Sequence, residues 1–176
     1  MPNAFIDTAW EASRQGALKL VIDTSSCAYA LKGLRPYLTP TNRRRYDRLT
    51  ILDAVDFLYG MILPGQPDVI KKKSIVLHPV CAIIKMDSQE KFFRLAEYCA
   101  EKVTVPLQTG CCGMAGDRGF LFPELTASAT LPEALEVSRQ AYDGYYSSTR
   151  TSEIAMSQSV NKNYESILYL LDEVVP

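Results

Sequence analysis

Short apolar runs, each followed by a small polar turn and a helix-like segment, recur four times along the chain. The runs end at turns 23–27, 78–81, 109–113 and 147–152. Their β-branched and aromatic residues are typical of strands. Strands that alternate with helices predict an α/β fold with a mostly parallel sheet flanked by helices. Right-handed crossovers would then place all four turns at the carboxyl ends of the strands, on one edge of the sheet.

Two longer segments carry apolar residues at helical spacing. One stripe predicts a helix over residues 46–63, which would pack on the sheet. The other predicts a helix that begins near Ser88, a favourable N-cap residue. Cys99 falls on the apolar stripe of that helix, where a free cysteine behaves as a small hydrophobic residue.

The composition is that of one ordinary globular domain. The chain has 176 residues, 47% of them hydrophobic, with 19 basic against 20 acidic side chains. This balance argues against a nucleic-acid partner. The N-terminal residues lack the charged lead and apolar run typical of a signal peptide, and the apolar runs are too short to cross a bilayer. We therefore expect a cytoplasmic protein that is not transmembrane. Its five cysteines should be reduced unless they bind metal or do redox chemistry.

Two of the four turns can be laid over one another without gaps. Residues 23–31 then match residues from 148 onward, with Cys27 on Ser152 and Ala30 on Ala155. The overlay indicates an internal duplication.

Four cysteines lie where strands end and helices begin, the usual place for ligand sites in α/β sheets: Cys27, Cys81, Cys111 and Cys112. Thiols at helix N-termini ionise more readily, and the thiolate is the form that binds metal. Gly110, Gly113 and Gly116 surround the adjacent pair. Glycines there permit positive φ and let backbone N–H groups approach cluster sulfur. The alternative is a tight turn whose small residues pack against a neighbour.

Three segments resemble one family. "HPVC" (78–81), "GCCGMAGDRGFLFPELTASAT" (110–130) and "DTSSCAYAL" (23–31) are similar to the cysteine-rich CCG domain at the C-terminal end of FAD-linked D-lactate dehydrogenases. Related domains occur in the iron–sulfur subunits of glycolate oxidase and in one of the subunits of heterodisulfide reductase. The resemblance covers nearly the whole chain. It implies two modules, with residues 1–66 as the remnant of a first module plus a connecting helix, and 67–176 as the second.

The resemblance also implies a ligand set. By position, Cys27 matches the late cysteine of the first module, Cys81 the first cysteine of the second, and Cys111 with Cys112 its CCG pair. Ser152 stands where the family's second module has a cysteine, and a hydroxyl is a poorer ligand for iron.

The ligand count leaves two metals open. Three thiolates and His78 would satisfy tetrahedral zinc, whereas an iron–sulfur cluster needs a further sulfur, which Cys27 could supply. If His78 is not a ligand, it is a strand-end histidine bonded to backbone. If Cys27 is not a ligand, it is an orphan thiol.

The expected function is an iron–sulfur electron-transfer domain of 4Fe-4S type, without a complete active site of its own. One partner would be the flavin-containing domain or subunit of a D-lactate-type dehydrogenase, which holds the FAD. The other would be an electron acceptor. Whether these partners bring the protein to the periphery of the inner membrane is left open. The alternative is a zinc-bound or metal-free structural domain. An unpaired strand edge, left by the absent part of the first module, favours a homodimer.

Overall fold

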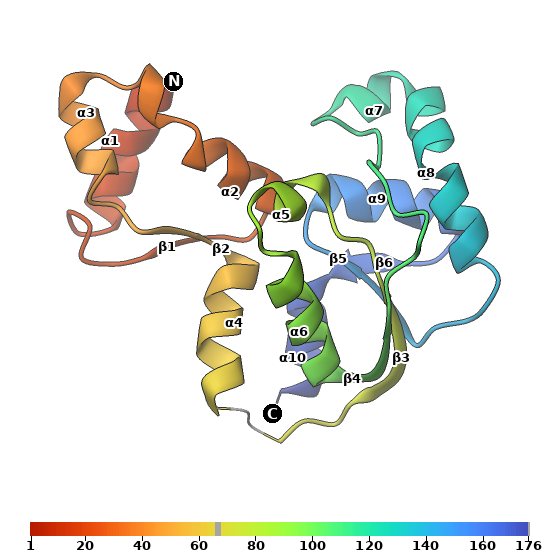
Figure 1. Ribbon diagram of the computed structural model, residues 1–176. Coiled ribbons are helices and arrows are strands. Elements are labelled where there is room, and N and C mark those ends of the chain that lie inside the picture. The colour runs from red at the N-terminus through yellow and green to blue at the C-terminus, as the bar shows by residue number, and fades with distance from the viewer. Residues whose placement is uncertain (66–67, 176) are drawn as a thin grey trace.

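The computed structural model describes residues 1–65 and 68–175 and has an α/β architecture (Figure 1). Its first part contains α1 (Pro2–Ala12), β1 (Leu20–Ile22), α2 (Ser25–Lys32), the short 3-10 helix η1 (Arg35–Tyr37), α3 (Pro40–Tyr46), β2 (Ile51–Asp53) and α4 (Ala54–Gly65). Its second part contains β3 (Lys72–Leu77), α5 (Cys81–Lys85), α6 (Gln89–Cys99), β4 (Ala100–Thr104), α7 (Arg118–Leu121), α8 (Pro123–Val137), β5 (Gly144–Ser147), α9 (Arg150–Val160), β6 (Tyr164–Ser166) and α10 (Ile167–Val174).

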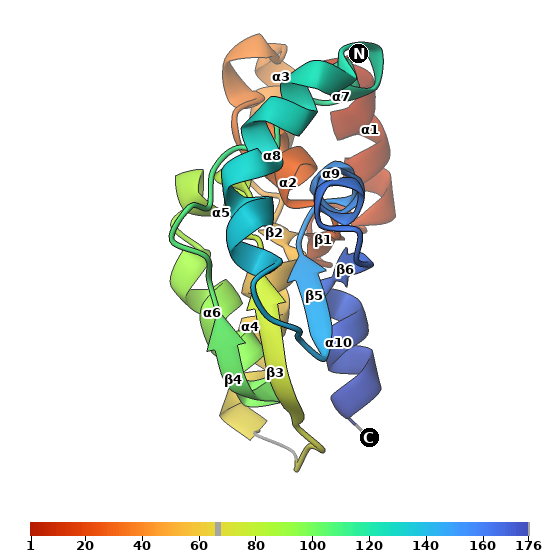
Figure 2. The same ribbon diagram turned by 90° about the vertical axis from the view of Figure 1, so that its right-hand side faces the viewer.

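The main sheet has the order β4-β3-β5-β6 with every pair parallel, which confirms the predicted fold class. Helices cover both faces of this sheet (Figure 2). Alternate residues of a strand point to opposite faces. Ile75 and Leu77 of β3 join a core with α4, α6 and α10, whereas Val76 packs with α8 and α9. The carboxyl ends of the strands therefore share one edge, as expected.

The expectation of a single sheet is wrong for the first strand. Within the described residues, β1 pairs only with β2, in a separate two-stranded parallel sheet. The two sheets still approach each other at their turns, because the Ser25 N–H donates to the Ser148 carbonyl at 3.1 Å. The hydroxyls of Ser26 and Thr149 lie 3.4 Å apart. The turns that the sequence overlay matched are thus neighbours in space.

The two regions around these turns follow the same path. We call β1-α2-β2-α4 the first repeat and β5-α9-β6-α10 the second repeat. Their parallel registers are equivalent, since Ile22 pairs with Asp53 in one and Ser147 with Ser166 in the other. The last helix of each repeat is also capped alike. Asp53 accepts from Val55 N at 2.9 Å, and Ser166 accepts from Leu168 N at 3.3 Å, so each cap bonds the residue two positions ahead.

The helix predicted over residues 46–63 is wrong in its first half. Residues 51–53 form β2, and α4 begins only at Ala54. Ile51 and Leu52 are half-buried against β1, so the pairing of two strands distant in sequence overrides the local helical spacing.

The second predicted helix is confirmed as α6, with Ser88 at the N-cap position. The Ser88 side chain does not cap the helix; its hydroxyl bonds the Asp56 carboxylate at 2.7 Å. Cys99 is fully buried as predicted, and burial raises the pKa of its thiol to about 12.

Within residues 1–65 and 68–175, no helix has both the length and the apolar character that crossing a membrane requires. The boundary between the two expected modules, 66/67, lies outside the described residues.

Candidate functional site

His78 directly follows β3 and is held from three sides. Its backbone N–H donates to the Tyr146 carbonyl at 2.8 Å, and its own carbonyl accepts from the Ser147 hydroxyl at 2.9 Å. Its ring Nδ1 lies 2.9 Å from each carboxylate oxygen of Glu133, on α8. Both side chains are almost completely buried. His78 thus lies at a strand end and is bonded through its backbone, but its ring contacts a carboxylate from a different helix.

The other ring nitrogen, Nε2, is buried and has no partner at normal hydrogen-bonding geometry among the residues that the structure describes. The Cys112 thiol nevertheless lies close enough to influence the ring. Burial lowers the pKa of His78, but interactions with Cys112 and Glu133 outweigh it and raise the pKa to about 9. An orphaned imidazole nitrogen beside a thiol is a donor pair that suits a transition metal.

Cys112 is half-buried, and its sulfur receives several donors. The Ser152 hydroxyl, in the first turn of α9, donates to the sulfur at 3.1 Å. Burial alone would raise the pKa of Cys112, but the nearby His78 ring and the hydrogen bonds from the Ser152 hydroxyl and the Met114 N–H outweigh it and lower the pKa. The position where the family pattern has a cysteine therefore does lie against the CCG pair, although a hydroxyl occupies it here.

The turn that carries Cys111 and Cys112 depends on two of its three predicted glycines. Gly113 and Gly116 have φ of +77° and +80°. The φ of Gly110 is not positive, and the space around it is open. The expectation that Gly110 needs a glycine-specific conformation is therefore wrong. The Gly113 N–H donates to the Cys111 sulfur at 3.4 Å, which is the predicted contact between a glycine amide and sulfur.

The remaining predicted ligands lie on helix starts at the surface. Cys81 is the first residue of α5, and Cys27 lies in the first turn of α2; both are exposed, as is Cys111. The helices α2 and α5 pack against each other, with the Lys85 ammonium 5.4 Å from the centre of the Tyr29 ring. In the described ranges no three His, Cys, Asp or Glu side chains are arranged to hold one metal ion. The structure brings together Cys112, His78 and Ser152, and leaves Cys81, Cys111 and Cys27 on adjoining surface elements.

Glu133 is the site residue that sequence reasoning missed. A glutamate in a helix ordinarily faces solvent, but Glu133 is 2% exposed. A signal was present in the spacing of Thr126, Thr130, Glu133 and Val137, which marks one face of α8, and all four are buried. A carboxylate on a buried stripe requires a partner, and the single histidine of the chain supplies it.

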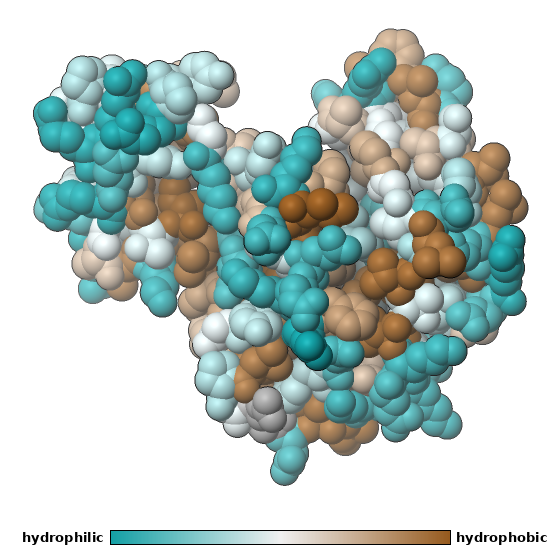
Figure 3. All heavy atoms as spheres, viewed as in Figure 1, coloured by the Kyte–Doolittle hydropathy of each residue, from teal (hydrophilic) through white to brown (hydrophobic). Residues whose placement is uncertain are grey.

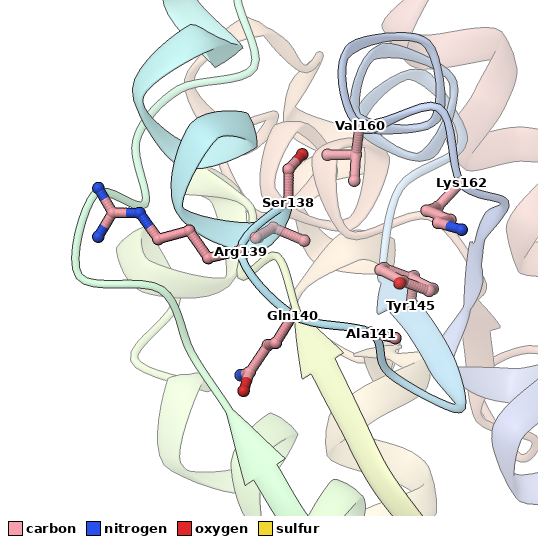
Figure 4. Close-up of a pocket in the computed structure, with 8 residues that line it drawn as sticks. Ser138, Arg139, Gln140, Ala141, Tyr145, Val160 and Lys162 are labelled. Atoms are coloured by element: carbon pink, nitrogen blue, oxygen red, sulfur yellow. The ribbon is translucent and has the colours of Figure 1, made fainter.

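A separate hollow of about 400 Å³ lies at the far end of α8 (Figure 4). Tyr145, Val160 and Lys162 line one side of it, whereas the Arg139 side chain points away into solvent. No cysteine, histidine or carboxylate lines it. The hollow therefore offers no chemistry comparable with that around Cys112.

No protein-family model matches the chain, and no curated protein matches it either. The resemblance to the CCG domain thus stays a prediction from the quoted motifs.

Proposed function

We propose that this chain is an iron–sulfur electron-transfer domain, of the kind that serves an FAD-linked 2-hydroxy-acid dehydrogenase of D-lactate type. The observation that carries the proposal is the Cys112 thiol beside the unpartnered Nε2 of His78, at the carboxyl ends of parallel strands. Such strand ends are where α/β folds place their ligands.

Each residue has a distinct role in this proposal. Cys112 is the central ligand, with Cys111 and Cys81 as further thiolate ligands from the neighbouring turn and helix start. The Ser152 hydroxyl and the Gly113 N–H support the two sulfurs through the hydrogen bonds already present. Glu133 holds Nδ1 of the His78 ring, which leaves Nε2 available as a ligand. A bound cluster would accept one electron at a time from a reduced flavin and pass it to an acceptor, and the FAD would belong to the partner.

A zinc-bound structural domain is the second candidate, and one observation favours it. Histidines that bind zinc usually present their other ring nitrogen to a carboxylate, as His78 does to Glu133. Three thiolates and one imidazole would complete a tetrahedral site without any contribution from Ser152.

Metal analysis of protein purified without oxygen tests both candidates. We expect iron and acid-labile sulfide in the wild type, and their loss in Cys112→Ser. The matched control is Cys99→Ala, whose buried thiol lies on α6, and which should keep its iron. Ser152→Cys should raise iron content, because it adds a thiolate beside Cys112.

Three results would overturn the proposal. Zinc without sulfide, lost in Cys112→Ser and in His78→Asn, would establish the second candidate instead. Protein free of both metals after anaerobic reconstitution would contradict both candidates. Iron that Cys112→Ser retains in full would place any cluster away from the CCG turn.

A further inference from the structure

The strand β1 has one free edge. The Leu20 N–H donates to the Thr50 carbonyl at 2.9 Å, toward β2. Because successive residues of a strand direct their backbone groups to opposite sides, the N–H and C=O of Val21 face away from β2. No other strand of the described chain pairs with β1. Val21 therefore presents an unpaired donor and acceptor at the edge of a sheet.

The second repeat shows what this edge is suited to do. β5 occupies in the second repeat the position that β1 occupies in the first, and β5 has neighbours on both sides, β6 and β3. The side of β5 that pairs with β3 corresponds to the free side of β1. The same local fold thus has a strand partner in one repeat and lacks it in the other.

The free edge also lacks the usual protection. The outer strand β4 of the main sheet exposes the charged side chains of Glu101 and Lys102. Charges at an edge discourage pairing with other chains. β1 instead exposes Val21, and Leu18 just before it, with 41% and 47% of their surfaces accessible. Figure 3 shows apolar side chains gathered over β1 and β2, in the recess between the N-terminal helices and α4.

The charges around Val21 are self-complementary. Lys19 and Asp23 are exposed, lie two residues on either side of Val21, and form no ion pair within the described residues. If two copies of β1 pair antiparallel about Val21, Lys19 of each copy faces Asp23 of the other. The Val21 residues then form a hydrogen-bonded pair that uses the unpaired N–H and C=O of both chains. Opposite charges directly across an antiparallel pair stabilise it, and like charges destabilise it.

We propose that the β1 edge is a homodimer interface, in which residues 19–23 of two copies pair antiparallel around a two-fold axis. The result is a continuous four-stranded sheet with the order β2-β1-β1-β2. A two-fold interface uses the same surface on both partners, and β1 is the surface that matches itself here. The proposal is independent of which metal, if any, the cysteines hold.

Charge-reversal variants of the full chain, followed by sedimentation over a range of micromolar concentrations, test this interface. The wild type should sediment as a dimer. Lys19→Asp and Asp23→Lys each place two like-charged pairs across the two-fold, and each should weaken dimerisation by about tenfold or more. An equal mixture of the two variants should form a heterodimer as strong as the wild type, because every facing pair is again of opposite charge.

Two controls show whether a loss of dimer arises at this edge. Lys102→Asp changes the same charge at the β4 edge and should leave dimerisation unchanged. Circular dichroism of each variant checks that it remains folded. A monomeric wild type, single variants that dimerise as well as the wild type, or a mixture that stays monomeric would each overturn the proposal. A wild type that is monomeric alone but binds a strand from another protein would overturn it too.

Discussion

The first and second repeats have the same backbone path but very different surroundings. In both, a strand leads through a small polar turn into a helix, and a second parallel strand leads into a capped helix. The first repeat offers Cys27 at its turn, exposed to solvent. The second offers Ser152, which is buried and donates to the Cys112 sulfur. Within the described residues, Cys27 of the first repeat belongs to no metal-binding cluster, whereas the second repeat has a serine, Ser152, beside Cys112.

This difference teaches that the repeat itself does not make the site. His78 follows β3, Cys112 follows β4, and Glu133 lies on α8, all of them between the two repeats in sequence. They reach the second repeat because β3 pairs with β5. Within the described residues, the first repeat has no strand at the equivalent edge. Its turn therefore lacks neighbouring residues equivalent to His78 and Cys112. Site chemistry therefore depends on the neighbouring strand.

The largest loss of unfolding free energy is expected from Glu133→Ala. The change leaves the buried His78 ring without its carboxylate, and breaking a buried charged pair typically costs about 3–5 kcal/mol of unfolding free energy. Urea unfolding measures the loss. The matched control is Glu124→Ala on the same helix, where the side chain is exposed and the change should stay within about 0.5 kcal/mol. A loss below about 1 kcal/mol for Glu133→Ala would show that the pair is not what holds α8 to β3.

Gly113→Ala comes next. Its positive φ alone costs an alanine about 1–2 kcal/mol. A Cβ there would also lie 3.0 Å from the Leu125 carbonyl oxygen, which adds a packing cost of about 1 kcal/mol or more. Gly116→Ala is the control, because its φ is similar but the space around it is open. Thermal unfolding should give a lower melting temperature for Gly113→Ala than for Gly116→Ala. Equal losses of stability in the two variants would argue against the close approach of the turn to α8.

Much of this architecture could be predicted from local sequence, and the exceptions share a cause. Turns that follow β-branched runs predict the parallel α/β fold, and the match of Cys27 with Ser152 predicts the repeat. Gly113 was predictable because only glycine adopts its backbone conformation freely. The separation of β1 from the main sheet was not predictable, since strand pairing depends on residues far apart in the chain. Glu133 was missed for the same reason, as its partner His78 is distant in sequence.

The helix caps give a smaller effect, and they test the equivalence of the repeats directly. Ser166→Ala removes the hydroxyl that accepts from Leu168 N and should cost about 1 kcal/mol. Ser166→Asp transfers the first repeat's cap to the second and should retain most of the stability, because aspartate caps as well as serine. Urea unfolding compares the two variants with the wild type. If both lose the same stability, the side chain at this position does not act as a cap.

The smallest expected effect concerns pH, because only the first repeat has a cap that titrates. Asp53 is fully buried; one of its oxygens accepts from Val55 N and the other has no partner. Burial raises the pKa of Asp53 above its ordinary value of 3.8, and the bond from Val55 together with the nearby Ser25 hydroxyl offsets this only in part. The folded chain therefore holds the Asp53 proton more firmly than the unfolded chain does. This contribution to stability is fully present below the unfolded pKa and is lost as pH rises through the folded pKa.

Asp53→Asn keeps the acceptor oxygen and removes the titration. The variant should therefore gain stability relative to the wild type as the pH rises above the ordinary aspartate pKa of about 4, measured by urea unfolding at each pH. Ser166→Ala, at the equivalent cap, should keep a constant difference from the wild type over the same range, because serine does not titrate. If the difference between Asp53→Asn and the wild type is also constant, Asp53 titrates normally. In that case the interior of the first repeat is open to water, and the two repeats differ in solvation as well as in chemistry.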